Sequence, residues 1–125
     1  MDYLWVGLGG FIGASARHLL GNMILERLGA TVPWHTFVIN MTGSLLIGAL
    51  MTLLVERSLV DSAWRPFVIV GFLGGYTTFS SYTFEAIALI ERGAWGPALA
   101  YTVGSNAIGL LATLAGMTAV RALIR

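Results

Sequence analysis

The chain has no lysine and no cysteine among its 125 residues, and charged side chains of either sign are few. The absence of cysteine excludes disulfides and thiolate metal sites. Charged residues make up only 10% of the chain, against about a quarter in a soluble domain. Apolar residues make up 57%, and the net charge of +1 gives no reason to expect a nucleic-acid partner. The composition therefore predicts an integral membrane protein, with one domain by length.

Four apolar segments lie between the charged residues, and each is long enough to be a transmembrane helix. A helix needs ~20 residues to cross a ~30 Å hydrocarbon core. The predicted spans cover residues 3–25, 36–55, 66–90 and 95–120. The connections are short, so we expect an all-α membrane protein made of one four-helix domain, residues 1–125, whose function lies within the bilayer.

The stretch from Gly74 to Thr83 interrupts the third apolar segment. Two adjacent glycines, five serine or threonine residues and three aromatic rings fall within these ten positions. Glycine costs backbone entropy in a helix, and Ser/Thr side chains compete for backbone hydrogen bonds. In lipid, a helix can be broken only where protein or a water-filled cavity covers the freed backbone groups. The sequence therefore predicts a functional weak point in the middle of the third span.

The arginines give only a small topological bias. With four spans, one side of the membrane holds Arg57, Arg65, Arg121 and Arg125. The other side holds Arg27 and Arg92, together with Arg17 if its side chain extends in that direction. Orientation follows the Lys/Arg imbalance of short loops. We therefore expect the chain to insert in both orientations.

Small residues recur on one face of the first and fourth predicted helices. Gly9 and Gly13 form a GxxxG pattern in the first, and Thr102, Asn106 and Gly109 follow helical spacing in the fourth. Such stripes let membrane helices approach closely. Packing within a bundle or a dimer explains most of these positions, and a dimer would bury the small and polar surface of four helices.

Three polar residues lie at membrane depth without an evident partner. Asn40 must face a partner or water, because an unpaired amide in hydrocarbon costs several kcal/mol; an interhelical hydrogen bond and a donor lining a path both fit. Arg17 and Glu85 would each cost roughly 2.5–3.5 kcal/mol at mid-bilayer. We expect these two charges to lie near interfaces or to pair with each other.

No catalytic constellation is visible, and His18 and His35 lack an evident nucleophile or metal partner, so we do not expect an enzyme. Phe79 and Tyr82 share a helix face, and the positive edges of their rings suit an anion. Carbonyls freed by a helix break from Gly74 to Thr77 could bind a small cation such as Na⁺.

These patterns together resemble the CrcB/Fluc family of fluoride channels over essentially the whole chain. The third-span motif is highly specific, and the order and spacing of all the motifs agree. The motifs are Gly9-Gly10-x-x-Gly13-Ala14-x-x-Arg17, Thr36-x-x-x-Asn40-x-x-Gly43, Gly71-Phe72-Leu73-Gly74-Gly75-Tyr76-Thr77-Thr78-Phe79-Ser80-Ser81 followed by Glu85, and Tyr101-x-x-x-Ser105.

The resemblance implies an inverted homodimer of four-helix subunits in which the third helix is broken mid-membrane. It implies a structural Na⁺ at the dimer centre, bound by the backbone carbonyls of Gly74 and Thr77 from each subunit. The fluoride pore would be lined by Asn40, Phe79, Tyr82, Tyr101 and Ser105. Tyr82 stands where the family usually has phenylalanine, and its hydroxyl would either hold fluoride longer or turn to another polar group.

The first functional hypothesis is a passive fluoride channel in the inner cell membrane that exports cytoplasmic fluoride and so reduces its toxicity. A small multidrug-type proton-coupled transporter is the alternative, since such proteins are also short four-span chains. A membrane scaffold that transports nothing is a third, but it leaves the polar stretch unexplained.

Overall fold

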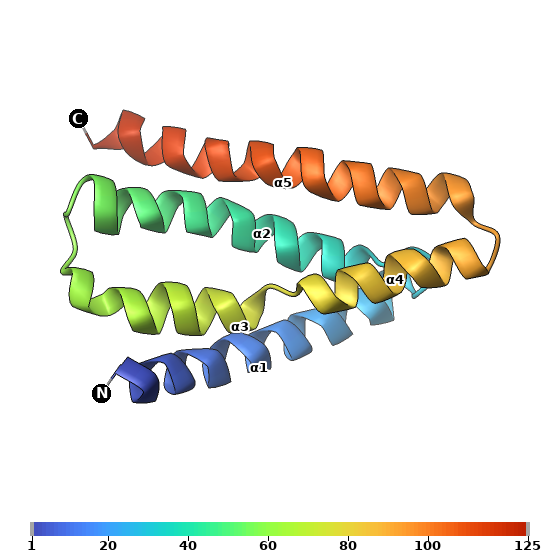
Figure 1. Cartoon of the computed structure of the whole chain (residues 1–125), viewed down its shortest axis with the longest axis horizontal. Coiled ribbons are helices and arrows are strands. Elements are labelled where there is room, and N and C mark those ends of the chain that lie inside the picture. Colours follow the sequence, from blue (N-terminus) through green and yellow to red (C-terminus); the bar gives the residue numbers. More distant parts are fainter. Residues whose placement is uncertain (1, 125) are drawn as a thin grey trace.

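A computed structural model describes residues 2–124, and every element within them is helical (Figure 1). Met1 and Arg125 lie outside the described residues, so the topological contribution expected of Arg125 is not placed. The elements are α1 (Asp2–Leu28), α2 (Trp34–Met51), π-helical η1 (Thr52–Glu56), 3₁₀-helical η2 (Ser62–Trp64), π-helical η3 (Pro66–Leu73), α3 (Gly74–Tyr76), α4 (Phe79–Glu91) and α5 (Trp95–Leu123).

The elements line up as four long rods, and the four predicted ranges all fall on them. The first rod is α1 and the fourth is α5, whereas α2 continues into η1 to make the second. The third consists of η3, α3 and α4. Two of the described helices, Trp34–Glu56 and Trp95–Leu123, are individually long and apolar enough to cross a membrane. That all four rods cross it stays a prediction.

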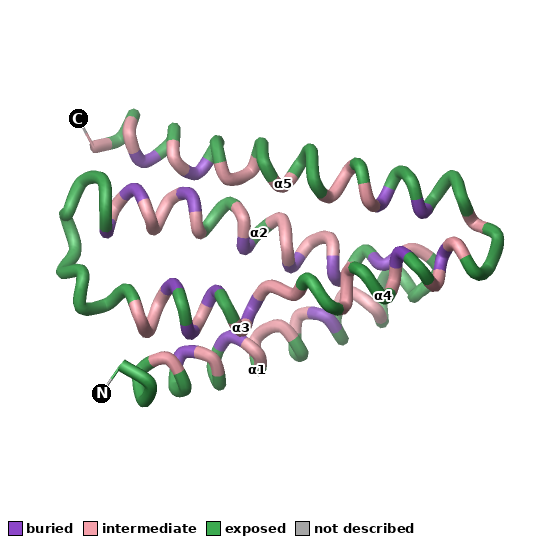
Figure 2. The backbone as a smooth tube through the Cα atoms, viewed as in Figure 1, coloured by how far each residue is buried: buried purple, intermediate pink, exposed green. Residues whose placement is uncertain are grey.

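Large apolar side chains cover the outside of the bundle. Leu99, Leu110 and Leu111 on α5 are all more than 60% exposed, and exposed positions run along the outer side of that helix (Figure 2). Soluble monomers rarely expose large apolar patches. Together with the two apolar helices, these exposed side chains are consistent with a helical membrane protein.

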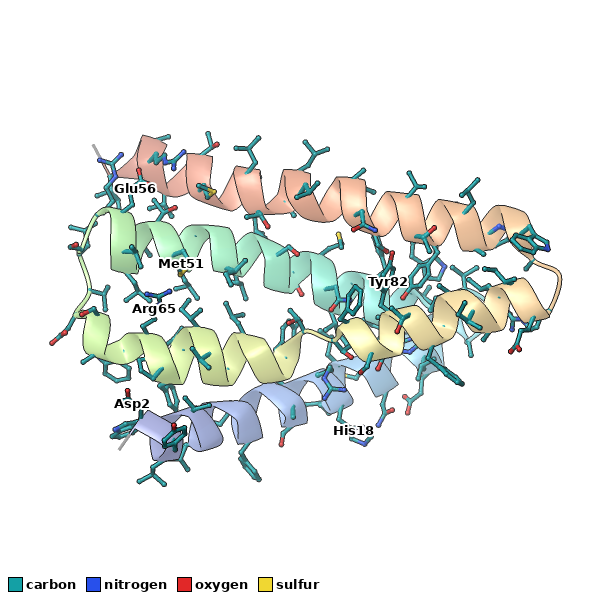
Figure 3. All side chains as sticks on the ribbon, viewed as in Figure 1. Asp2, His18, Met51, Glu56, Arg65 and Tyr82 are labelled. Atoms are coloured by element: carbon teal, nitrogen blue, oxygen red, sulfur yellow. The ribbon has the colours of Figure 1, made fainter. Side chains whose placement is uncertain are left out.

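The chain termini and the connections between the rods gather at the two ends of the bundle (Figure 1). The start of α1, the end of α5 and the connection from η1 to η3 lie at one end, and the other two connections lie at the opposite end (Figure 1). At the first end, Arg121 Nη2 donates to Glu56 Oε2 at 2.7 Å and Arg121 Nε donates to Oε1 at 2.9 Å. This exposed pair joins the end of α5 to η1, beside the labelled Glu56 in Figure 3.

Glycines bring the backbones of neighbouring rods into direct contact. A Cβ at Gly13 would collide with the Phe72 carbonyl, so α1 lies against the end of η3. In the same way, a Cβ at Gly48 would collide with the Thr113 carbonyl, and one at Gly116 with the Leu45 carbonyl. The small-residue stripes therefore pack α1 on the third rod and α2 on α5, as close helix approach requires.

Replacing Gly13 with alanine should destabilise the fold. Overpacking of this kind costs about 1–3 kcal/mol, because the new methyl group meets the Phe72 backbone. Gly7→Ala on the same helix is the matched control, since nothing lies within 4 Å of a Cβ at Gly7. Thermal unfolding in detergent should show a lower midpoint for Gly13→Ala only. Equal midpoints for the two variants would contradict the packing described here.

Candidate functional site

The third rod is interrupted at two threonines, where the backbone is extended. Thr77 has φ −81° and ψ 158°, and Thr78 has φ −146° and ψ 118°. Thr78 then caps α4, because its Oγ1 accepts from the Ser81 N–H at 3.2 Å. Threonine is a favoured N-cap residue for this reason. The hydroxyl-rich sequence that weakens the rod thus also starts its second half.

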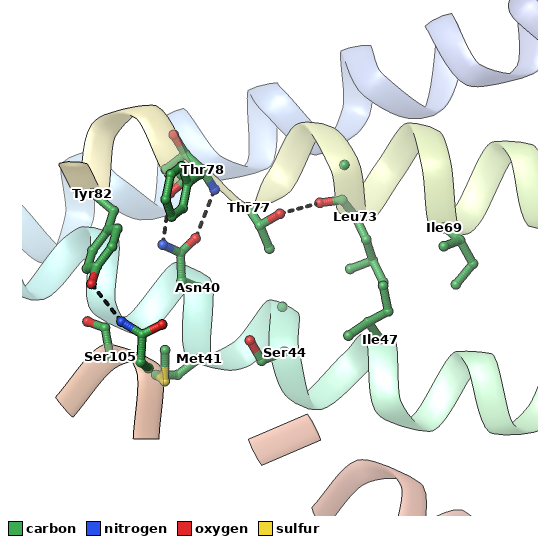
Figure 4. A pocket seen from close by; sticks show the side chains of 14 residues that line it. Asn40, Met41, Ser44, Ile47, Ile69, Leu73, Thr77, Thr78, Tyr82 and Ser105 are labelled. Carbon is green, nitrogen blue, oxygen red and sulfur yellow. Dashed lines mark hydrogen bonds between the residues drawn. The ribbon is translucent and has the colours of Figure 1, made fainter. Parts of the chain in front are cut away.

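Asn40 on α2 binds both backbone groups of Thr78. Its Nδ2 donates to the Thr78 carbonyl at 2.9 Å, and its Oδ1 accepts from the Thr78 N–H at 2.8 Å (Figure 4). The Asn40 side chain therefore supplies the acceptor that the Thr78 N–H would have had in a continuous helix, and it adds a donor to the carbonyl from which α4 starts. Asn40 is half-buried and has interhelical hydrogen bonds, one of the two roles expected for it, and one Nδ2 hydrogen remains for the space beside it.

The interruption leaves carbonyl oxygens without their helical donors. The Thr78 N–H that would reach Gly74 is turned to Asn40, and the Ser81 N–H that would reach Thr77 is turned to the Thr78 hydroxyl. Within residues 2–124, no hydrogen bond to the Gly74 or Thr77 carbonyl is found. The next carbonyl, that of Gly75, accepts from Arg17 Nε at 3.0 Å.

Close packing holds the interruption from two sides. A Cβ at Gly43 on α2 would collide with the Thr77 side chain, and a Cβ at Gly75 would lie 2.8 Å from the Gly10 carbonyl of α1. Thr77 Oγ1 also turns back to the Leu73 carbonyl at 2.9 Å. The extended residues are therefore fixed between α1 and α2.

A cleft of about 360 Å³ opens beside the interruption, between α2, the third rod and α5. No charged side chain is among the described residues that line it. Figure 4 shows Asn40, Ser44, Tyr82 and Ser105 around this space. The lining consists of Asn40, Met41, Gly43, Ser44, Ile47, Ile69, Leu73, Gly74, Thr77, Thr78, Phe79, Tyr82, Ser105 and Asn106.

Ser105 lines the cleft and carries a buried hydroxyl. Its Oγ is buried and has no hydrogen-bond partner among the described residues. A buried polar group left without a partner costs free energy comparable to a lost hydrogen bond. A bound polar species in the cleft would remove that cost.

Three aromatic rings run from α4 to α5. The Phe79 and Tyr82 centroids lie 5.6 Å apart with planes tilted by 48°, and Tyr82 and Tyr101 lie 5.2 Å apart with a tilt of 53°. Phe79, at the outer end of this row, is 75% exposed within the single chain. Both pairs are tilted, intermediate between stacked and edge-to-face packing, at centroid distances typical of interacting aromatic rings.

Glu85 does not line the cleft, and its carboxylate contacts three polar side chains. Its Oε2 accepts from Thr36 Oγ1 at 2.9 Å and lies 2.9 Å from His35 Nε2, while its Oε1 accepts from the Tyr101 hydroxyl at 3.1 Å. Of the two expectations for Arg17 and Glu85, mutual pairing is wrong, since each has other partners. His35, for which the sequence suggested no partner, has one in Glu85.

Six of the seven residues predicted from the sequence lie on one cleft: Asn40, Gly74, Thr77, Phe79, Tyr82 and Ser105. Tyr101 is the exception, because its hydroxyl turns to Glu85 and it does not line the cleft. Sequence reasoning missed Asn106, which lines the cleft and bonds Tyr82. Its position in the polar stripe of the fourth span was the available signal.

The fold and the site define a class: a helical membrane protein with a neutral polar cleft beside an interrupted helix. A family model described as "CrcB-like protein, Camphor Resistance (CrcB)" matches residues 4–117. The chain belongs to this family.

Curated relatives match nearly the whole chain. A protein from Acidobacterium capsulatum is 45% identical over 117 residues, which cover 94% of each chain. One from Solibacter usitatus is 46% identical over 116 residues, covering 93% of this chain and 95% of the relative. One from Koribacter versatilis is 39% identical over 122 residues, covering 98% and 97%. Each of these relatives bears the name "fluoride-specific ion channel FluC".

Removing the Asn40 amide should expose the backbone of Thr78. In Asn40→Ala the Thr78 N–H loses its acceptor, so its amide hydrogen should exchange with solvent at least about tenfold faster, which corresponds to ~1.4 kcal/mol of lost protection. Hydrogen exchange followed by mass spectrometry on peptides spanning residues 74–83 measures this. Asn22→Ala is the control, because Asn22 bonds only His18 on α1. Unchanged exchange in Asn40→Ala would contradict the bonding described.

Proposed function

We propose that this chain forms a passive fluoride channel that lets fluoride leave the cytoplasm, and so reduces fluoride toxicity. The observation that carries this function is the 39–46% identity to relatives named fluoride-specific ion channels, over more than nine-tenths of the chain. The function is conduction rather than catalysis. Its setting would be the inner cell membrane, where the negative cell interior favours exit of an anion.

The chemistry of the cleft suits a small dehydrated anion. Fluoride loses a large hydration energy in a dry path and passes only if fixed donors replace water while binding it weakly enough to release it. The free Nδ2 hydrogen of Asn40, the Ser105 hydroxyl and the edges of the Phe79 and Tyr82 rings supply neutral donors on one surface. Tyr101 would border this path only if the path extended beyond the cleft toward Glu85, to which the Tyr101 hydroxyl donates.

An inverted homodimer, with the interrupted helix at mid-membrane, fits the exposed side of the cleft. Phe79 lines the cleft yet is 75% exposed in a single chain. Gly74 also lines the cleft, and a Cβ there would meet only the Ile69 carbonyl at 3.9 Å. A second copy covering this face would enclose the path and remove the freed backbone groups from lipid, as a break in a membrane helix requires.

The carbonyls of Gly74 and Thr77 would hold a structural Na⁺ at the centre of that dimer. Both are hard oxygen acceptors that the interruption leaves without donors, and carbonyls of unwound membrane helices are suited to Na⁺. Two from each subunit would converge on the ion. The bound cation would link the two subunits through their carbonyls.

The small multidrug-type transporter is not favoured. Proton-coupled exchange needs a carboxylate in the substrate cavity, and Glu85 lies outside the cleft lining with three partners of its own.

Purified protein in liposomes should release fluoride but very little chloride. Liposomes loaded with potassium fluoride, with valinomycin to carry compensating potassium, allow efflux to be followed with a fluoride electrode. Phe79→Ile removes a ring edge and should slow efflux by roughly threefold to tenfold, the effect of about 0.5–1.5 kcal/mol of ring interaction.

Phe84→Ile is the matched control for Phe79→Ile. Phe84 lies on the same helix and is 74% exposed, but it does not line the cleft. Its efflux should equal that of the wild type. Chloride passing as readily as fluoride would overturn the proposed selectivity.

Gly74→Ala should weaken the dimer although it fits within one subunit. A partner copy facing Gly74 would meet the new methyl group, whereas the chain itself leaves room for it. Light scattering coupled to size exclusion, in sodium chloride and in N-methyl-D-glucamine chloride, gives the dimer fraction and its Na⁺ dependence. Gly96→Ala, where nothing lies within 4 Å of a Cβ, should behave as wild type. A wild-type chain that is monomeric in both salts would refute the dimer, and a dimer indifferent to sodium would refute the ion.

A further inference from the structure

The Tyr82 hydroxyl and the Asn106 amide form a small closed network between α4 and α5. Asn106 Nδ2 donates to the Tyr82 hydroxyl oxygen at 2.9 Å and to the Thr102 carbonyl at 2.8 Å. The Tyr82 hydroxyl donates to the same carbonyl at 3.2 Å. Figure 4 shows the Tyr82 side chain reaching across from α4 toward α5 at the edge of the cleft.

The donors and acceptors in this network are fully assigned. The Thr102 carbonyl only accepts, so the amide nitrogen of Asn106, rather than its oxygen, must face it. That nitrogen has two hydrogens and two acceptors within reach, the Tyr82 oxygen and the Thr102 carbonyl, so there is one acceptor for each hydrogen. The single hydroxyl hydrogen of Tyr82 goes to Thr102. Neither side chain keeps a donor for an anion, although both line the cleft.

What Tyr82 presents to the cleft is therefore its ring. The ring lies between Phe79 and Tyr101, at centroid distances of 5.6 and 5.2 Å. A ring edge is a weak, diffuse donor, whereas an amide N–H in a dry path is a strong one. Conduction requires that an anion be held weakly enough to leave. A second free amide hydrogen, at position 106, added to the one that Asn40 already offers, would hold the anion more tightly and work against release.

We propose that Tyr82 is a positioning residue that keeps the Asn106 amide out of the fluoride path. Its hydroxyl occupies one amide hydrogen, and α5 in turn fixes the ring so that its edge faces the ion. This inference rests on the proposed fluoride channel and names a residue pair that tunes it. It assigns the hydroxyl of Tyr82 to Asn106 and Thr102, and not to fluoride.

The test is fluoride efflux from liposomes at a series of internal fluoride concentrations. Tyr82→Phe keeps the ring and frees one Asn106 hydrogen, which would then hold fluoride more tightly. Both the maximal rate and the half-saturating fluoride concentration should therefore fall by roughly threefold or more. A single hydrogen bond, worth ~0.5–1.5 kcal/mol, is enough to produce a change of this size. Adding Asn106→Val to Tyr82→Phe removes the freed donor. The double variant should return the half-saturating concentration to within about twofold of wild type.

Tyr76→Phe is the matched control, because that hydroxyl bonds Thr42 Oγ1 at 2.8 Å and the residue does not line the cleft. It should leave the half-saturating concentration unchanged. If Asn106→Val does not fold in the double variant, Asn106→Ala takes its place, because alanine also lacks a side-chain donor.

Three results would overturn the inference. A higher half-saturating concentration in Tyr82→Phe would mean that the hydroxyl itself binds fluoride. If the half-saturating concentration shifted equally in Tyr82→Phe and in the double variant, Tyr82 and Asn106 would not be coupled. If it did not shift in Tyr82→Phe, the network would not act on the ion. In each case wild-type efflux still supports the channel, whereas a wild-type protein that passes no fluoride would remove the proposed function as well.

Discussion

The paired hydrogen bonds between Asn40 and the backbone of Thr78 are the interaction on which the site depends. They satisfy the N–H that the third rod gives up where it becomes extended, and they add a donor to the Thr78 carbonyl from which α4 starts. Without them, a half-buried N–H would lack an acceptor, and in a membrane such a group costs several kcal/mol. Because the Thr78 N–H is turned to Asn40, the Gly74 carbonyl is released. The same contact therefore fixes the position of α4 and creates the acceptors beside it.

Small residues make this contact possible. Asn40 reaches Thr78 only because Gly43, one turn further along α2, lets the helix lie against Thr77. On the other side, Gly75 lies against the backbone of α1, where Arg17 covers the Gly75 carbonyl. Membrane helices gain much of their stability from such close backbone packing. The stripes of glycine and the polar residues at the interruption are thus parts of one arrangement.

Much of this could be predicted from the sequence. Helix positions followed from apolar segments of sufficient length, and the weak point followed from Gly74, Gly75 and the hydroxyl residues after them. Partners could not be predicted, because which side chains meet depends on how the rods rotate and cross. Arg17 and Glu85 illustrate this: opposite charge suggested a pair, but the geometry gives Arg17 the Gly75 carbonyl and Glu85 the Thr36, His35 and Tyr101 side chains. The hydroxyl of Tyr82 likewise had two possible roles until Asn106 was placed beside it.

The placement of charge explains how a neutral cleft can serve a charged ion. Arg17 and Glu85 both lie within predicted membrane spans, but neither lines the cleft. Arg17 donates to the Gly75 carbonyl, and Glu85 accepts from Thr36. A fixed positive charge at the cleft would bind an anion tightly and slow its release, and a fixed carboxylate would repel it. Neutral donors avoid both extremes, since each stabilises fluoride only modestly and several act together. A cleft with such a lining favours passage over storage, which is what a channel requires and a binding protein does not.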